Sequence, residues 1–88
     1  MSMRIDKSWV VLASIENYEK DRCVDLFARA DGTFGFEEFR RDVEDQGRWT
    51  AIRYHSVIAY ESEAAALQAA THAVGWFAEV IAHRAAKA

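Results

Sequence analysis

The sequence predicts an α+β domain, in which a four-stranded antiparallel β-meander is followed by one long C-terminal α-helix packed on one sheet face. Runs rich in β-branched and aromatic residues alternate with short polar segments, which is typical of strands joined by turns. Asp31-Gly32 lies between two such runs and favours a tight hairpin. An alanine-rich amphipathic stretch after Ser62 indicates a helix that covers the sheet.

Four segments have the composition of strands. We expect strands over residues 9–15, 22–29, 33–41 and 48–55. The connections between them are short, so consecutive strands should pair antiparallel. The 88 residues are expected to form a single domain, with residues 1–7 flexible.

The hairpin at Asp31-Gly32 sets the expected register of the central strands. A two-residue turn, with both residues at positive φ, would place Asp25 opposite Glu38. Two acidic side chains would then face each other at a cost in stability. We therefore expect a β-bulge near Glu37-Glu38 that turns Phe39 to a new face.

The last part of the chain predicts one helix over residues 62–84. Ser62 is suited to the N-cap, because its hydroxyl can accept a hydrogen bond from an amide of the first turn. An apolar stripe with steps of three and four residues should cover the sheet. Its members are Leu67, Ala70, Val74, Phe77 and Ile81.

A second stripe on the neighbouring side of this helix predicts a dimer interface. It consists of Ala69, Ala73, Trp76 and Val80. Their spacing matches a helix-pairing seam, and Trp76 would be its large anchor. The alternative is that Trp76 folds back onto its own domain after a break in the helix at Gly75.

Composition limits the classes of partner. The net charge of −3 argues against a dedicated nucleic-acid binder and, more weakly, against an anionic membrane surface. No apolar run approaches the roughly 20 residues that span a bilayer. A single cysteine, Cys23, excludes an internal disulfide, and we expect a cytoplasmic location.

The sequence contains no pattern that carries known chemistry. We therefore expect no catalytic residue, no metal site and no cofactor, and a protein that is not an enzyme. A functional role of Cys23 or His55 is left open. Six arginines interleaved with aromatic residues leave a nucleic-acid-binding sheet face as an alternative, although seven acidic residues nearly balance their charge. These arginines are Arg22, Arg29, Arg40, Arg41, Arg48 and Arg53.

Two stretches, DGTFGFEEFRRDVEDQGRW and YESEAAALQAA, carry a resemblance. Through them the chain resembles a small family of bacterial proteins of unknown function that have a β-meander followed by a helix. The resemblance covers about residues 24–77 and implies the fold, but no site residue. The layout is also similar to sheet-plus-helix DNA-binding domains such as the arm-binding domains of integrases, which are basic, unlike this chain.

The leading functional expectation is a small non-enzymatic interaction or accessory module that forms a homodimer. A broad apolar patch on the helix would favour this interpretation. The alternatives are a nucleic-acid-binding module, favoured by a basic patch, and a small-ligand binder or enzyme. A sizeable pocket lined by His55 or Cys23, between sheet and helix, would favour the last of these.

Overall fold

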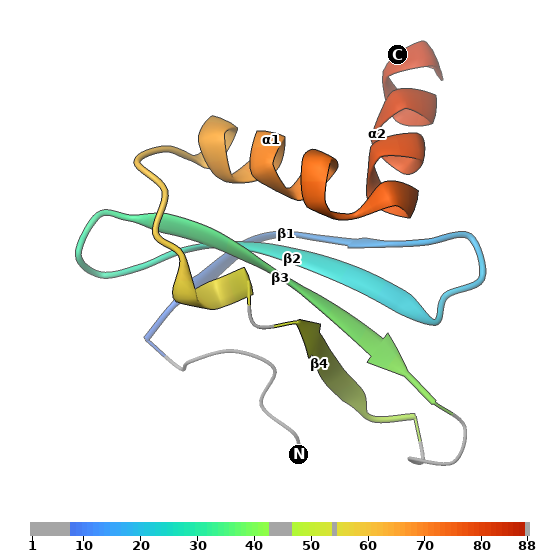
Figure 1. Ribbon diagram of the computed structural model, residues 1–88, viewed down its shortest axis with the longest axis horizontal. Coiled ribbons are helices and arrows are strands. Elements are labelled where there is room, and N and C mark those ends of the chain that lie inside the picture. Colours follow the sequence, from blue (N-terminus) through green and yellow to red (C-terminus); the bar gives the residue numbers. More distant parts are fainter. Residues whose placement is uncertain (1–7, 43–46, 54, 88) are drawn as a thin grey trace.

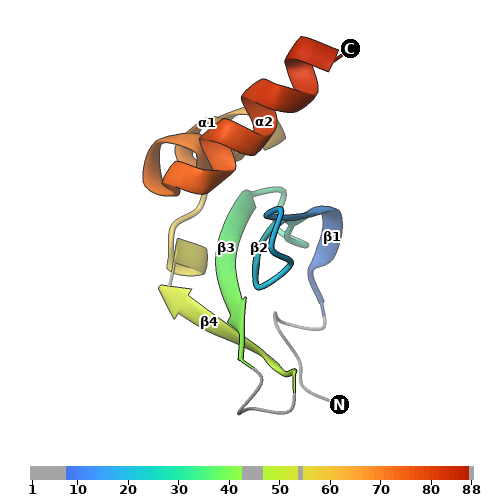
Figure 2. The same ribbon diagram turned by 90° about the vertical axis from the view of Figure 1, so that its right-hand side faces the viewer.

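Four antiparallel strands form one sheet, and two α-helices lie over one of its faces (Figures 1 and 2). The computed structural model describes residues 8–42, 47–53 and 55–87, so the predicted flexible segment 1–7 lies outside it. The strands follow the chain order, β1-β2-β3-β4. They are β1 (Val10–Glu16), β2 (Arg22–Ala28), β3 (Phe34–Arg41) and β4 (Trp49–Arg53). The α+β class and the antiparallel sheet predicted from the sequence are confirmed.

A short 3-10 helix, η2 (His55–Val57), connects the sheet to α1 (Glu63–Ala73) and α2 (Gly75–Lys87). The predicted N-cap is confirmed at Ser62. Its backbone is extended, at φ −152°, and its hydroxyl accepts a hydrogen bond of 3.0 Å from the Ala65 amide. This bond satisfies one of the amides that the first helical turn leaves without a backbone partner.

The prediction of one long helix is wrong, because the chain breaks at Val74. This residue is extended, with φ −121° and ψ 104°. Its amide still donates to the Ala70 carbonyl, while its own carbonyl accepts from the amides of Phe77 and Ala78 and so begins α2. The break keeps the Val74 side chain in the core and lets α2 rise away from the sheet (Figure 1). The neighbouring Gly75, a poor helix former, lowers the cost of interrupting the helix here.

The core lies between the helices and the facing side of the sheet. Within the predicted apolar stripe, three residues are buried (Ala70, Val74 and Phe77) and two are partly buried against them (Leu67 and Ile81). The sheet contributes Ile15, Val24, Leu26 and Phe36. The three- and four-residue periodicity therefore identified the covering face, although the helix that carries it is interrupted.

The β2–β3 hairpin turns at Asp31-Gly32, but its loop is one residue longer than predicted. The Arg29 amide donates to the Thr33 carbonyl, and the Gly32 amide donates to the Arg29 carbonyl. Gly32 has φ +88°, whereas Asp31 does not have positive φ. This is a type I turn followed by a left-handed glycine, and its extra residue shifts the register.

The shifted register places Asp25 opposite Glu37 instead of Glu38. The β2–β3 pairing runs without interruption, so the predicted bulge is absent from it, and Phe39 stays on the face of Glu37. A register shift does occur between Glu38 and Phe39, but in the pairing with β4. The extra residue is Ile52, on β4. A bulge of this kind bends the strand that contains it, and β4 is angled away from the other strands (Figure 2).

Asp31 stabilises the turn through its side chain. Its Oδ1 accepts hydrogen bonds from the Thr33 hydroxyl at 2.6 Å and the Thr33 amide at 3.0 Å. These two bonds, the hydroxyl first, lower the pKa of Asp31 below its ordinary value. They hold the loop in the conformation that presents Gly32 at positive φ.

We expect the substitution Gly32→Val to lower the free energy of unfolding by about 1 kcal/mol or more, because a β-branched residue resists positive φ. Urea unfolding followed by fluorescence measures the loss. The matched control is Gly75→Val, at a helix start where φ is not positive and an added Cβ meets no atom within 4 Å. Equal losses for the two variants would contradict the assigned turn.

Candidate functional site

The four residues predicted to form a dimer interface do not share one exposed face. Val80 is buried in the core, and Ala69 packs partly buried against it. Trp76 is half-buried, and its Nε1 donates a hydrogen bond of 2.9 Å to Glu38 Oε2 of its own sheet. Of the four, Ala73 alone is exposed. The self-contact of Trp76 that the sequence left open is therefore present.

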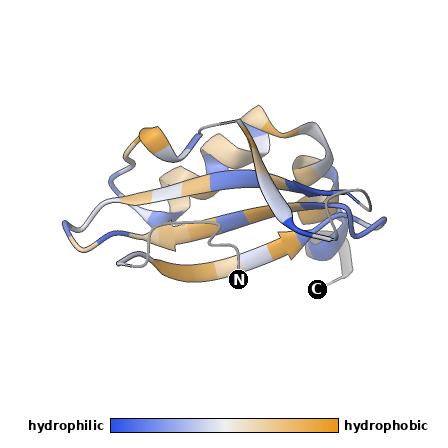
Figure 3. Cartoon of the chain, turned by 90° about the horizontal axis from the view of Figure 1, so that it is seen from below, coloured by the Kyte–Doolittle hydropathy of each residue, from blue (hydrophilic) through white to orange (hydrophobic). Residues whose placement is uncertain are grey.

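Large apolar side chains are exposed on β1 instead. Val10, Val11 and Leu12 are 62%, 41% and 42% exposed. A register shift between Val11 and Ala13 in the pairing with β2 makes Leu12 a bulge residue. β1, the lowest strand in Figure 3, is mostly orange, which shows the apolar character of this edge.

Within the described residues β1 is an edge strand, because β2 is the strand that pairs with it there. Natural edge strands are often protected from further pairing by charged residues, especially lysine. Residues 9–15 contain no charged residue, and the first charge along the strand is Glu16. This edge therefore combines exposed apolar side chains with an absence of charge, and the bulge at Leu12 is the one irregularity in its backbone pairing with β2.

The sheet face opposite the helices contains buried polar groups. Asp25 Oδ1 accepts hydrogen bonds from the Ser14 hydroxyl at 2.7 Å and the Cys23 thiol at 3.3 Å. The Cys23 sulfur lies 3.2 Å from the Ser14 oxygen. Buried polar groups need such partners, so we interpret this cluster as part of the packing of this face.

Glu37 lies opposite Asp25 and is 2% exposed. Outside β3 its hydrogen-bond partners are in η2, whereas those of Asp25 Oδ1 are in β1 and β2. The Glu37 carboxylate accepts hydrogen bonds from the amides of His55 at 3.3 Å and Ser56 at 3.1 Å. The His55 ring stacks on Phe36, with centroids 4.7 Å apart. Glu37 therefore anchors the start of η2, and donors on opposite sides hold the two acidic groups in place.

The arginines of the sheet region are largely engaged within the chain. Arg29 stacks on Trp9 and Phe27, Arg41 stacks on Trp49, Arg22 lies near Asp21, and Arg40 lies near Asp42. Arg48 is exposed, and the side chain of Arg53 is outside the described residues. These separate contacts give the nucleic-acid alternative little support in the part of the chain that the structure describes.

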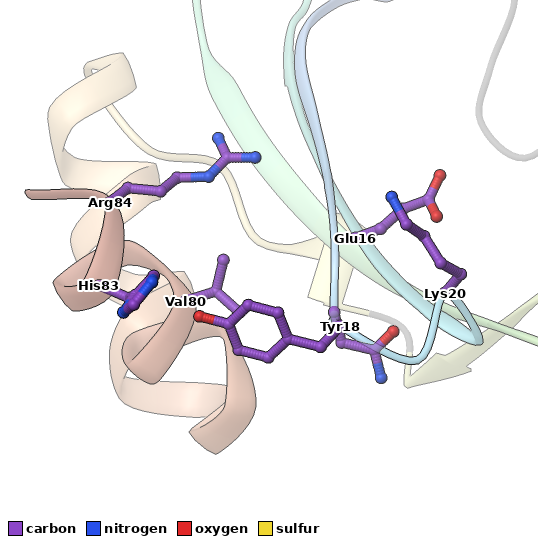
Figure 4. Close-up of a pocket in the computed structure, with 7 residues that line it drawn as sticks. Glu16, Tyr18, Lys20, Val80, His83 and Arg84 are labelled. Carbon is purple, nitrogen blue, oxygen red and sulfur yellow. The ribbon is translucent and has the colours of Figure 1, made fainter. Parts of the chain in front are cut away.

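A cavity of about 540 Å³ lies between the β1–β2 turn and α2 (Figure 4). Glu16 to Tyr18 and Lys20 line it from the turn, and Val80, His83 and Arg84 line it from α2. The Tyr18 and His83 rings meet edge to face, with centroids 5.9 Å apart. The volume is within the range of small-molecule sites, roughly 300–1,000 Å³.

The sequence did not indicate this cavity. The ligand-binding alternative required a pocket lined by His55 or Cys23, whereas the histidine that lines this cavity is His83. The lining residues come from two parts of the chain that are at least 60 positions apart, the end of β1 with its following turn and α2. Their proximity depends on the direction of α2, which the break at Val74 sets.

The chain has no significant similarity to a protein-family model, a curated protein or a solved structure. Over residues 8–42, 47–53 and 55–87, the structure contains no helix long and apolar enough to cross a membrane. Within the same ranges, no three or more His, Cys, Asp or Glu side chains are grouped so as to hold a metal ion.

Proposed function

We propose that this protein is a small non-enzymatic interaction module that acts as a cytoplasmic homodimer, and that two copies pair through their β1 strands. The observation that carries the proposal is the edge at residues 9–15, which is uncharged and exposes Val10, Val11 and Leu12. An edge of this kind is a template for pairing with another chain.

A second copy is the occupant that fits this edge best. Antiparallel pairing about a twofold axis near Ala13 brings Glu16 of one copy opposite Val10 of the other, so no two charges oppose each other. The axis is then normal to the sheet, and the helices of both copies lie on the same side. The result is a continuous eight-stranded sheet in which the exposed valines and leucine gain apolar cross-strand neighbours.

We expect the wild-type protein at about 100 μM to sediment with twice the 10.0 kDa mass of one chain. The substitution Leu12→Lys should weaken the dimer at least about 100-fold. Twofold symmetry introduces the change twice, and each lysine replaces apolar burial with a charge. Analytical ultracentrifugation over a concentration series measures this loss.

The control is Ile58→Lys, because Ile58 is an isomer of Leu12, has a similar exposure of 49%, and belongs to the connection after η2 rather than to β1. It should leave the dissociation constant unchanged. A wild-type monomer at this concentration would contradict the proposal, as would a dimer that both variants weaken equally. Circular dichroism establishes that each variant keeps its fold.

A further inference from the structure

We propose that the cavity between the β1–β2 turn and α2 is a binding site for a small aromatic anion, such as an aryl phosphate or aryl carboxylate. This inference goes beyond the proposed self-association and is independent of it. The volume of about 540 Å³ exceeds the need of a single ring that carries one acidic group.

The charge of the cavity favours an anion. Lys20 and Arg84 approach it from different elements, and Glu16 is its one acidic lining residue. Within the described residues, neither cation lies within ion-pair distance of a carboxylate. In Figure 4, Arg84 extends from α2 towards β1, and Lys20 lies beside Glu16 on the other side of the cavity. The lining therefore has two cations and one carboxylate, which makes it locally positive in a chain of net charge −3.

The apolar part of the cavity favours a ring. Tyr18 presents an aromatic surface against His83, and Val80 forms an apolar wall. Aromatic pairs prefer offset or edge-to-face contacts, which a third ring beside Tyr18 can also adopt. A ligand that combines a ring with a negative charge therefore matches both halves of the lining.

The turn holds Lys20 in place before any ligand binds. The buried Asn17 accepts hydrogen bonds from the amides of Asp21 and Arg22, at 3.1 and 3.0 Å. Arg41 donates a bond of 2.7 Å to the Lys20 carbonyl. Lys20 itself has φ +63°, a left-handed conformation in which glycine would be less strained. These bonds fix the backbone of Lys20, so less backbone entropy is lost when its side chain binds a ligand.

The test is an NMR titration with phenyl phosphate at pH 7, followed at the ring signals of Tyr18 and His83. We expect saturable binding with a dissociation constant of about 1 mM, the range expected for a ligand of this size. Inorganic phosphate has the anionic group without a ring, and benzyl alcohol has the ring without a charge. Each should bind at least about 10-fold more weakly than phenyl phosphate. Lys20→Gly and Arg84→Gln should each weaken phenyl phosphate binding about 10-fold.

Lys20→Gly distinguishes binding from structure, because glycine suits the left-handed turn and should preserve or raise the melting temperature. Arg48→Gln removes one exposed positive charge that is not part of the cavity lining and should leave binding unchanged. No saturable shift up to about 10 mM phenyl phosphate would overturn the proposal. Equal binding by Lys20→Gly and the wild type would also overturn it, and tight binding of inorganic phosphate alone would remove the aromatic requirement.

Discussion

Replacing Glu37 with leucine should lower the free energy of unfolding by about 2 to 4 kcal/mol. The loss arises because the partly buried amides of His55 and Ser56 would be left without their acceptor, and a fully buried donor in that state costs about 1–3 kcal/mol. Relief of the like-charge contact with Asp25 offsets part of the loss. Urea unfolding of the wild type and the variant measures the difference.

Glu37→Gln is the matched variant, because the amide keeps one oxygen acceptor at nearly the same volume. Its free energy of unfolding should fall by about half as much as that of the Glu37→Leu variant. If Glu37→Leu were as stable as the glutamine variant, the hydrogen bonds to η2 would contribute nothing. The role of Glu37 as the anchor of this connection would then be wrong.

Replacing Arg29 with methionine should cost about 2 to 3 kcal/mol. The guanidinium donates hydrogen bonds to the carbonyls of Phe34, at 3.0 Å, and Ser56. It also lies 4.6 Å from the centroid of Trp9, within range of a cation–π contact. Methionine retains most of the apolar stem but none of the donors, so the loss reports on the guanidinium. Thermal and urea unfolding provide the measurement.

Arg40→Met is the control for this prediction. Arg40 is exposed, and its contact with Asp42, at 3.6 Å, is a surface ion pair of little expected value. Its substitution should change stability by less than about 0.5 kcal/mol. A similar effect at both positions would mean that Arg29 does not tie the hairpin to η2.

Glu37 and Arg29 together explain how the sheet positions the connection to α1. The Glu37 carboxylate accepts from the Ser56 amide, and the Arg29 guanidinium donates to the Ser56 carbonyl. One backbone residue is therefore held by opposite charges from β3 and from the end of β2. This attachment precedes the antiparallel bridge between Tyr60 and Phe34, after which α1 begins.

The features that the sequence predicted well depend on local chemistry. Composition located the strands, the Ser62 hydroxyl marked the start of α1, and Gly32 marked the hairpin. The stripe from Leu67 to Ile81 identified the side of the helices that covers the sheet. In each case the residues that give the signal are also the residues that form the contact.

The features that it missed depend on contacts distant in sequence. The register error arose because Asp31-Gly32 fits both a two-residue and a three-residue loop, and the turn alone does not distinguish them. The break in the helix and the inward contact of Trp76 were offered by the sequence as an alternative only, because the bond from Trp76 to Glu38 joins positions 38 residues apart. The cavity between the turn and α2 depends on the direction that α2 takes after the break. The helical periodicity of the sequence does not specify that direction and so could not predict the cavity.

The most direct test of the proposed β1 interface is an isotope-filtered NMR experiment on a mixture of labelled and unlabelled protein at about 1 mM. Cross-peaks between the two copies report which surfaces touch. Pairing through β1 predicts intermolecular cross-peaks from the methyl groups of Val10, Val11 and Leu12. Intermolecular cross-peaks confined to α1 and α2, or none at all at this concentration, would contradict it.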